Sequence, residues 1–583
     1  MQWHDWNDAA FDRARERNCP VLLFLRTSWC QWCRDMEKNA LSDERVQAIL
    51  TDRFVCIQVD KDERHDLDER YRKGGWPTLA FLDSHGEILA SANYLEAEEF
   101  LAYLELVGQN FPDSPETIRA GLEDAPKEKT AAPAPAGARR RRSTTLSMDL
   151  VEDVLETLLE SADPVHGGWG TRHKFPHPEA LHFLLVRWSQ TGDRETLGTV
   201  MRTLRHMQEG EIFDQVEGGF YRYATQPDWS VPNHGKMLDS NAQRLQAYVE
   251  AYQALGEESL RETASGIIDW MTSTLLDPVT RAFKGSQDAD PEYAHLTSLE
   301  ARQKHGAPDC DPTVFCNWNA MAVSSLMKSS MVLDRDRYRL RALETLDFLM
   351  DNLWSERNGM YHYWDGAQNL PGMLTDQAYT LRALVDAMHY AGENKYLEPA
   401  LALANVTVER MRADDGSFYD RRASSSGRSE LQIRNRSILE NAVMAEAMLR
   451  LSHLAHEPEL AVQARKTLAS FLQDYKRYGH FVAGYGRAVD LLFHEPVCIT
   501  IVGPKMADQT RALRKAALHS YVASRIVQTI DPEVDDELLE RSGLPIPHED
   551  TARAFIHRGN ESYAETSKPE RLPALMTRSE RSN

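Results

Sequence analysis

The chain has 583 residues, with 67 Lys and Arg against 89 Asp and Glu, and therefore a formal net charge of −22. A balance this acidic disfavours broad electrostatic capture of nucleic acid or of an anionic membrane surface, because both need a cationic face. With 42% hydrophobic and 27% charged residues, the composition is that of an ordinary soluble globular protein, and the length allows several domains.

The cysteines and the N-terminal residues indicate the cellular compartment of the protein. Seven cysteines, an odd number spread over the whole length, do not form a disulfide framework and favour a reducing environment. Residues 1–19 carry several charges and no apolar run typical of a secretory signal. No segment reaches the ~18 uninterrupted apolar residues of a membrane helix. We therefore expect a cytoplasmic protein that binds neither nucleic acid nor membrane.

One break in composition divides the chain. Residues 131–137 read Ala-Ala-Pro-Ala-Pro-Ala-Gly, and Arg139 to Arg142 follow after one alanine. Such a stretch has too few apolar side chains to offset the entropy of ordering, so it predicts a linker. The predicted organisation is a first domain over 1–115, a linker over 116–146, a large unit over 147–493 and a small region over 494–583.

The first domain mixes strand and helix patterns. The patterns predict, in order, a buried strand at Pro20–Leu25, a helix from Cys33 to Leu50, a buried strand at Phe54–Val59, a hairpin of Thr78–Leu82 with Glu87–Ala90, and a helix near 96–107. The domain is therefore predicted to be α/β.

The large unit is predicted to be almost entirely helical. Candidate helices lie near 147–161, 178–191, 193–208, 237–254, 257–276, 315–334, 336–353, 374–391, 394–412, 437–455 and 457–475. Turns that combine glycine with an aromatic residue recur at 167–170, 218–223, 283–285, 359–363, 416–419 and 484–486. Six such turns between helix pairs favour a closed (α/α)6 toroid over the alternative, an open helical solenoid.

In the last region, the residue pattern changes from helical to mixed strand and helix. A buried strand at 496–502, a helix ending near Leu518 and a strand at 524–530 predict a small α/β appendage. The fold class that results is a multidomain α+β protein with an α/β domain, a toroid and this appendage.

Trp29-Cys30-Gln31-Trp32-Cys33 stands between a buried strand and a helix. Two cysteines three residues apart in a first helical turn can close a disulfide, and the helix N-terminus stabilises the thiolate of the first. Cys30 is the predicted attacking thiol and Cys33 the resolving thiol. Gly75-Trp76-Pro77 precedes the next strand, where a thioredoxin-like fold places a cis-proline loop facing the cysteines.

The cysteines also allow other interpretations. A zinc site needs about four ligands, but the chain has no second Cys-x-x-Cys. Cys19, Cys56 and Cys498 stand in or beside apolar strands, and we interpret them as small buried hydrophobic residues. We predict neither a metal nor a cofactor.

With these residues in view, the chain resembles the spermatogenesis-associated protein 20 family. Its first domain matches in Trp29–Glu37, Phe54–Arg64 and Gly75–Pro77, which implies a thioredoxin-like fold with Cys30, Cys33, Pro77, Trp29 and Trp76 at the site. The family usually reads Cys-His-Trp-Cys-His, whereas this chain has Gln31 and Arg34 at the histidine positions.

The resemblance continues through the large unit, at 173–176, 213–223, 287–290, 317–319 and 375–379. It implies a toroid similar to N-acylglucosamine 2-epimerases and six-hairpin glycosidases, which bind sugars in the mouth of the ring. Aromatic rims stack on sugars and paired carboxylates supply acid and base. The implied binding residues are Lys174, Asp214, Tyr221, Tyr223, His234, Lys236, Asp288, Asp290, Trp318, Asn319, Asp376 and Asn441.

Two departures weaken the catalytic interpretation of the ring. Asn233 and Gly235 stand where the family has histidine and glutamate, so a carboxylate is missing. Three hypotheses remain. The first is a thiol-disulfide oxidoreductase or redox sensor that acts on a protein thiol or disulfide partner. The second is a carbohydrate epimerase, isomerase or hydrolase that acts in the toroid. The third is a scaffold without catalysis.

Overall fold

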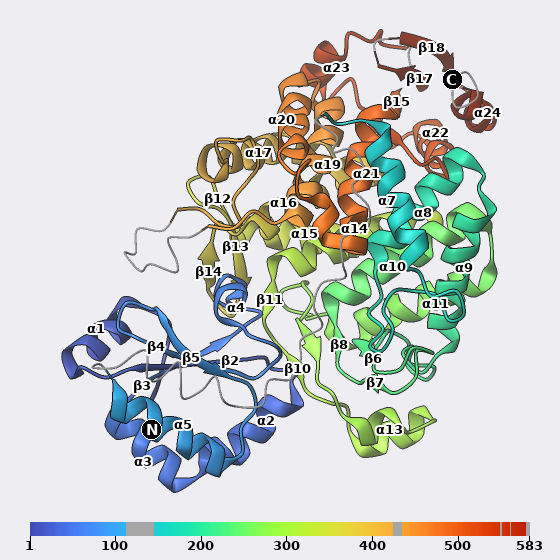
Figure 1. The fold of residues 1–583 in the computed structure, drawn as a ribbon. Coiled ribbons are helices and arrows are strands. Elements are labelled where there is room, and N and C mark those ends of the chain that lie inside the picture. Colours follow the sequence, from blue (N-terminus) through green and yellow to red (C-terminus); the bar gives the residue numbers. More distant parts are fainter. Residues whose placement is uncertain (112–144, 424–433, 548–550, 560, 579–583) are drawn as a thin grey trace. The chain divides into compact units, whose positions relative to one another are not determined.

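The computed structural model describes residues 1–111, 145–423, 434–547, 551–559 and 561–578 (Figure 1). The chain divides into two compact units, of which one comprises Met1–Arg141 with Ala423–Asn435 and the other Arg142–Arg422 with Arg436–Asn583. The linker predicted over 116–146 lies outside the described residues up to residue 144. Within the described ranges, no helix is long and apolar enough to cross a membrane.

The first unit is built on a five-stranded sheet with the order β1-β3-β2-β4-β5. The strands are β1 (Trp3–His4), β2 (Val21–Arg26), β3 (Val55–Asp60), β4 (Thr78–Leu82) and β5 (Ile88–Ala92). Strands β1 and β2 run parallel to β3, and β4 runs antiparallel to β2 and β5. Along β2, Val21 and Leu23 enter one buried cluster while Leu22 and Phe24 enter another, so both faces of the sheet are covered.

Helices cover the two faces of this sheet. Phe11 of α1 (Asp8–Arg17) and Leu67 of α4 (His65–Tyr71) pack in the cluster on one face. Leu50 of α3 (Glu44–Arg53) and Phe100 of α5 (Ala97–Asn110) pack in the cluster on the other, together with Met36 of α2 (Gln31–Lys38). The result is a three-layer thioredoxin-like domain.

The single helix predicted from Cys33 to Leu50 is wrong, because it is two helices. Helix α2 ends at Lys38, a short 3₁₀ turn follows at Ala40–Ser42, and α3 begins at Glu44. The carboxylate of Asp43 accepts hydrogen bonds from the backbone N–H groups of Arg45 and Val46, and this N-cap starts the second helix. The apolar spacing is compatible with one helix, but the cap divides it.

The second unit contains a closed ring of six helical hairpins. The inner helices are α8 (Pro178–Thr191), α10 (Leu238–Leu255), α14 (Cys316–Val332), α16 (Leu374–Asp386), α19 (Ile438–Ala455) and α21 (Ala483–Phe493). The outer helices are α7 (Met148–Ser161), α9 (Arg194–Glu209), α11 (Glu258–Trp270), α15 (Asp336–Leu353), α17 (Leu397–Met411) and α20 (Pro458–Ala469). Each inner helix contacts the next, and α21 contacts α8, which closes the ring. The (α/α)6 toroid is therefore present, rather than an open solenoid.

Short strands and helices occupy the loops of the ring. These are β6 (Tyr223–Ala224), β7 (Pro232–Asn233), β8 (Lys236–Met237), β9 (Ser286–Gln287), β10 (Cys310–Asp311), β11 (Val314–Phe315), β12 (Trp354–Ser355), β13 (Gly359–Trp364), β14 (Gln368–Pro371), α12 (Pro291–Ala294) and α13 (Leu299–His305). Most of the glycine-aromatic turns do lie here. Gly218 has a φ of +77°, and a Cβ there would lie 2.2 Å from the carbonyl oxygen of Gly266, so only glycine fits.

The turn predicted at residues 484–486 is wrong. Gly484 and Gly486 lie in the first turn of α21, the sixth inner helix. A Cβ on Gly486 would come within 2.8 Å of Val154 on α7 and 3.2 Å of Phe183 on α8. Glycine here permits close packing between helices, which the sequence pattern does not distinguish from a turn.

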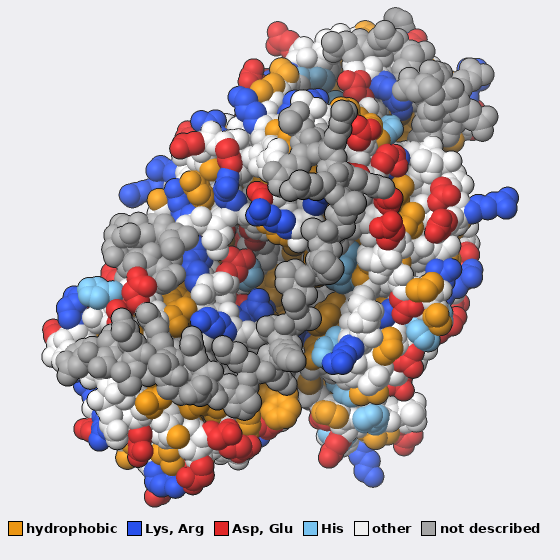
Figure 2. Space-filling view, viewed as in Figure 1, with side chains coloured by type: hydrophobic (Ala, Val, Ile, Leu, Met, Phe, Trp, Pro, Cys, Tyr) orange, Lys and Arg blue, Asp and Glu red, His pale blue; other side chains and the backbone are white. Residues whose placement is uncertain are grey.

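A four-stranded sheet follows the ring in the same unit, in the order β16-β15-β17-β18. Its strands are β15 (Val497–Val502), β16 (Arg525–Ile530), β17 (Arg553–Arg558) and β18 (Glu561–Thr566), with helices α22 (Asp508–His519), α23 (Asp536–Ser542) and α24 (Leu572–Arg578). Met331 and Tyr390 from the ring pack against the core of this sheet. On the face in Figure 2, acidic and basic side chains are interspersed over the second unit.

Candidate functional site

The dithiol lies at the start of α2. Cys30 is the N-cap residue of this helix, and Cys33 lies in its first turn. The Cys30 residue is 6% exposed and Cys33 is fully buried, and both are free thiols. Strand β2 ends at Arg26, so the chain passes from the central strand to the helix within four residues. The dithiol therefore lies where a short loop joins strand β2 to helix α2.

The Sγ of Cys30 has two backbone contacts. It accepts a hydrogen bond from the N–H of Cys33 at 3.4 Å, and it donates one to the carbonyl oxygen of Trp76 at 3.5 Å. The peptide bond between Trp76 and Pro77 is cis. Asn93 fixes this loop, because its amide donates to the carbonyls of Gly75 at 2.7 Å and Pro77 at 3.1 Å. The structure therefore brings the two cysteines and the proline loop together.

The two thiols differ in their surroundings. The hydrogen bond with Cys30, together with burial, raises the pKa of the Cys33 thiol well above its usual range. Cys33 therefore holds its proton while Cys30 is also reduced. Thiolate at Cys30 is stabilised by the N–H groups at the start of α2. This asymmetry matches a first thiol that attacks and a second that acts later.

Two tryptophans flank the dithiol. The rings of Trp29 and Trp76 meet edge to face with centroids 5.6 Å apart. The indole N–H of Trp29 donates to Asp62 and that of Trp76 to Asp68, both at 2.8 Å. The Nζ of Lys61 lies 5.5 and 5.4 Å from the two ring centroids. These contacts fix both indoles beside the sulfur atoms.

In the ring, three of the predicted sugar-binding residues hold loops. Lys174 donates to the carboxylate of Asp163 at 2.7 Å and to a glycine carbonyl. Lys236 repeats this arrangement with Asp214 at 2.6 Å and the carbonyl of Gly218. Burial opposes the charge of Asp214, but Lys236 and Arg302 lower its pKa to about 2. Lys174, Asp214 and Lys236 are thus engaged within the protein.

Two predicted amide residues anchor turns to the inner helices. The side chain of Asn319 bonds to both the N–H and the carbonyl of Phe283, at 2.7 and 3.0 Å. Asn441 does the same with Phe418, at 2.7 and 2.9 Å. Asn241 repeats the pattern with Phe220 at 2.6 and 2.9 Å. The same bond pair therefore recurs on three inner helices, α10, α14 and α19.

The remaining predicted ring residues fall into separate groups. Tyr221 and His234 are neighbours, with ring centroids 5.0 Å apart, and Tyr223 stacks on Phe175. Asp290 caps α12 by accepting from Tyr293 at 2.9 Å.

The other three lie elsewhere in the ring loops. The backbone N–H of Asp288 donates to the carbonyl of Asp309. Trp318 packs against Phe315, and the fully buried Asp376 hydrogen-bonds to His362 at 2.9 Å. No described contact joins all of these residues into one site.

Comparison with known proteins adds the family. Residues 1–123 match a family model described as "Protein of unknown function, DUF255" and named Thioredox_DsbH. Spermatogenesis-associated protein 20 of Homo sapiens is 24% identical over 712 aligned residues, which cover 99% of this chain and 90% of the human protein. The chain is similar to spermatogenesis-associated protein 20. The resemblance seen in the sequence is confirmed over nearly the whole length.

Two further likenesses concern the separate units. Thiol:disulfide interchange protein DsbD of Yersinia pestis is 30% identical over 98 residues, 16% of each chain. Among solved structures, a sugar epimerase from a ruminal bacterium has a TM-score of 0.47 and 13% identity, and the match covers 59% of this chain and 98% of that one.

The positions that depart from the family's dithiol motif contact one another. Arg34 donates to the carbonyl of Ser28 at 2.8 Å and to the side chain of Gln31 at 3.0 Å. Gln31 in turn donates to Asp35 at 2.7 Å. A series of hydrogen-bonded side chains thus stands next to the cysteines, where the family has two imidazoles.

Sequence reasoning missed the acidic segment after β3. Asp60, Lys61 and Asp62 lie at the carboxyl end of β3, beside the end of β2 that leads to Cys30. Burial and the charge of Asp62 raise the pKa of Asp60 to about 8. Parallel neighbours end at the same edge of a sheet, so charged residues directly after β3 were a signal for this site.

Proposed function

We propose that the first unit is a thiol-disulfide oxidoreductase. The observation that carries the proposal is the position of the Cys30 sulfur, between the N–H of Cys33 and the carbonyl oxygen of Trp76 next to a cis proline. A thiolate at a helix N-terminus is a nucleophile at neutral pH. The buried Cys33 stands one helical turn away, within reach of the same sulfur.

The reaction proceeds by two exchanges. The Cys30 thiolate attacks one sulfur of a substrate disulfide, the substrate S–S bond breaks, and the second substrate sulfur leaves as a thiolate that takes up a proton. Cys33 then loses its proton and attacks Cys30, which closes a Cys30–Cys33 disulfide and releases the other substrate thiolate. The substrate gains two electrons, and a dithiol reductant must return them to the protein.

The surroundings favour a protein disulfide as substrate. Trp32, between the two cysteines, is 60% exposed and contacts Tyr94 at a ring distance of 5.3 Å. An exposed aromatic side chain beside a dithiol suits an extended apolar segment of a partner. In a cytoplasmic location, the dithiol is the resting form and reduction is the expected direction.

Trapping tests this proposal. In the full-length Cys33→Ser variant, the mixed disulfide at Cys30 cannot be resolved, so covalent adducts accumulate that a reductant releases. The matched Cys30→Ser variant and the Cys56→Ser variant of a buried strand cysteine separate the site from general thiol chemistry. Wild type should also reduce insulin disulfides in the presence of dithiothreitol. No adduct in Cys33→Ser, or equal adducts in Cys30→Ser, refutes the proposal.

The geometry supports this function better than the other two hypotheses. In the ring, Asp214, Lys236 and Asn319 are all engaged in bonds within the protein, which accounts for them without a sugar. The Cys30 sulfur, in contrast, contacts the N–H of Cys33 and the carbonyl of Trp76, an arrangement that suits thiol chemistry. This arrangement disfavours a scaffold without catalysis.

A further inference from the structure

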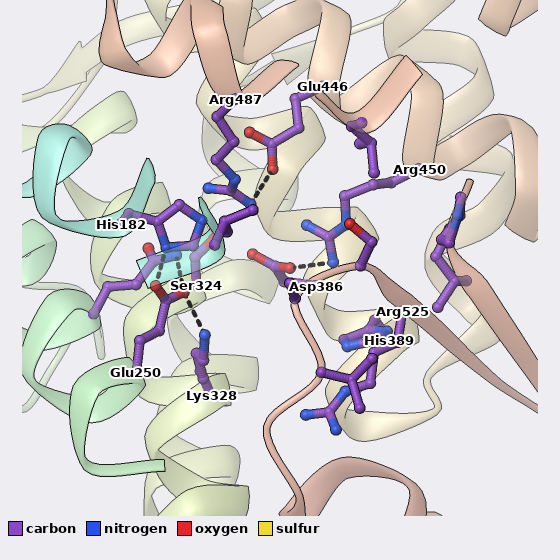
Figure 3. A pocket seen from close by; sticks show the side chains of 18 of the residues that line it. His182, Glu250, Ser324, Lys328, Asp386, His389, Glu446, Arg450, Arg487 and Arg525 are labelled. Atoms are coloured by element: carbon purple, nitrogen blue, oxygen red, sulfur yellow. Dashed lines mark hydrogen bonds and ion pairs between the residues drawn. The ribbon is translucent and has the colours of Figure 1, made fainter. Parts of the chain in front are cut away.

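A polar cavity lies inside the ring, apart from the loops discussed above. About 70 Å³ of this cavity can hold the centres of water-sized molecules, and it opens to solvent. Charged side chains reach it from the inner helices, among them Glu250 of α10, Lys328 of α14, Asp386 of α16, Arg450 of α19 and Arg487 of α21 (Figure 3). A ring interior of this kind would ordinarily be filled by apolar side chains.

The sheet after the ring closes one end of the cavity. Residues 521–526, which lead into β16, are part of its lining. The backbone N–H of Val527 donates to the Nδ1 of His389 at 3.0 Å, and Gln528 donates to the carbonyl of Leu454 at 2.6 Å. From α10, Gln253 donates to the carbonyl of Leu518 at 2.7 Å. The sheet therefore caps the carboxyl ends of the inner helices.

The four carboxylates of the cavity lining are each paired with a cation. The pairs are Glu250 with Lys328, Asp386 with Arg450 at 2.7 Å, Glu446 with Arg487 at 2.6 Å, and Asp490 with Arg187 at 3.2 Å. Figure 3 shows three of these pairs as dashed lines across the cavity. All four anionic charges are thus already matched.

Two guanidinium groups of the lining, those of Arg382 and Arg525, make no ion pair with a described carboxylate. Arg382, only 7% exposed, makes no hydrogen bond and no ion-pair contact with any described residue, although its burial is outweighed by the more distant charges of Glu446 and Glu179, which raise the pKa of its guanidinium group. Arg525 donates to the backbone carbonyls of Ala517, Leu518 and Ser520 and to no described carboxylate. Arginine stays protonated in proteins, and an uncompensated buried charge is costly. The cavity lining has five Lys and Arg side chains against four Asp and Glu, an excess of one positive charge, and Glu179 lines the adjoining pocket.

Three buried polar atoms around Arg382 also lack a described partner. They are the Oγ of Ser324, the Nε2 of His182 and the Nη1 of Arg487. Ser324 and His182 are 4% and 8% exposed. Both residues, with Arg382 and Arg487, line this cavity and also the adjoining smaller pocket toward Glu179, so they surround the junction of the two. Buried polar groups without partners are rare in native proteins.

We propose that this junction binds a small anion through a phosphate or carboxylate group, held by Arg382, Arg487 and Ser324. The planar guanidinium fork matches both groups, and its hydrogen bonds to them are strong because both partners are charged. The Nδ1 of His182 bonds to Glu250, so its Nε2 faces the junction and can accept from a hydroxyl on the ligand. One ligand thus satisfies the excess charge and all three orphaned atoms.

Calorimetric titration of the full-length protein tests this, with inorganic phosphate and malonate as separate probes at constant ionic strength in chloride. We expect one equivalent to bind, and binding to weaken at least tenfold in Arg382→Met. Arg194→Met, which removes an exposed arginine at the start of α9, is the matched control and leaves binding unchanged. Binding of phosphate alone or of malonate alone identifies the group that the site takes.

A second variant tests the site independently, in case Arg382→Met fails to fold. Ser324→Ala removes a hydroxyl that has no described partner, so the fold is kept while anion binding weakens several-fold. A protein that binds neither probe, or one whose binding Arg382→Met and Ser324→Ala leave unchanged, overturns the proposal. These measurements do not involve the cysteines, so their outcome is independent of the proposed thiol chemistry.

Discussion

The backbone N–H of Cys33 donates a hydrogen bond to the Sγ of Cys30 across 3.4 Å. This bond stabilises a thiolate at Cys30, because its donor belongs to the first turn of α2. The same proximity raises the pKa of Cys33. These two contacts within one helical turn support the proposed order, in which Cys30 attacks first and Cys33 acts second.

Alkylation should distinguish the cysteines. Under native conditions at pH 7.5, iodoacetamide should modify Cys30 at least tenfold faster than Cys56 and Cys498, whose pKa values burial raises to about 12. Peptide mapping by mass spectrometry follows each site. In Cys30→Ala the fast phase should disappear, and in urea all sites should react. Modification of Cys56 at the rate of Cys30 in the folded protein would contradict this assignment.

Asp60 should make the first unit less stable as the pH rises. Its carboxyl has a pKa of about 8 in the folded protein against 3.8 as the ordinary value, chiefly because of burial and then Asp62. Between about pH 4 and pH 8 the unfolded chain releases this proton while the folded one keeps it. Each pH unit in that window therefore lowers the stability of the folded state by up to about 1.4 kcal/mol.

The Asp60→Asn variant tests whether stability falls as the pH rises because of Asp60. Its amide can still accept from the N–H of Asp62, which donates to Asp60 at 2.9 Å. Calorimetric melting should give similar transitions for variant and wild type at pH 4, with the variant increasingly more stable up to pH 8. A difference in melting temperature that is the same at pH 5 and pH 8 would show that Asp60 is ionised throughout.

How much of the structure can be predicted from the sequence depends on how far apart the interacting residues stand along the chain. The dithiol was predictable because its determinants are local: a buried strand, two cysteines three residues apart and a helix. The ring was predictable from helical periodicity and repeated turns. Helices α1 and α4 were not predicted, because both are short and mostly polar.

The polar cavity was missed for a different reason. Lys328, Asp386 and Glu446 each stand in an inner helix whose neighbours are almost all buried. A charge in such a helix is a signal, since lysine, aspartate and glutamate are almost never buried unless paired. The sequence does not show which charges meet, because the partners stand in different helices, 41 positions apart for Glu446 and Arg487 and 78 for Lys328 and Glu250. Only the closed ring brings Lys328 to Glu250.

Asn441 should matter for stability. Replacement by leucine leaves the N–H and the carbonyl of Phe418 without their bonds to this side chain, at a cost of about 2–4 kcal/mol. Denaturation of the second unit, followed by circular dichroism, measures this. Asn319→Leu should cost a similar amount, because its bonds are equivalent. A variant with unchanged stability would favour a binding role for Asn441 instead.

Arg382 and Arg450 should respond in opposite directions when each is changed to methionine. Arg450 is paired with Asp386 at 2.7 Å, so Arg450→Met leaves a buried carboxylate alone and should lower stability by about 3–5 kcal/mol. Arg382 forms no ion pair with a described carboxylate, so in the absence of anions Arg382→Met breaks no ion pair and should leave stability unchanged or higher. Calorimetric melting in chloride buffer measures both.

Phosphate should reverse this ranking for Arg382. Ligand that binds only the folded state stabilises it by about 2.7 kcal/mol at a hundredfold excess over the dissociation constant, so wild type should gain and Arg382→Met should not. The double variant Arg450→Met with Asp386→Leu is the control, because removing both members of the pair should recover most of the stability lost in Arg450→Met. If Arg382→Met is as destabilised as Arg450→Met in chloride, Arg382 supports the fold and its charge is compensated within the protein.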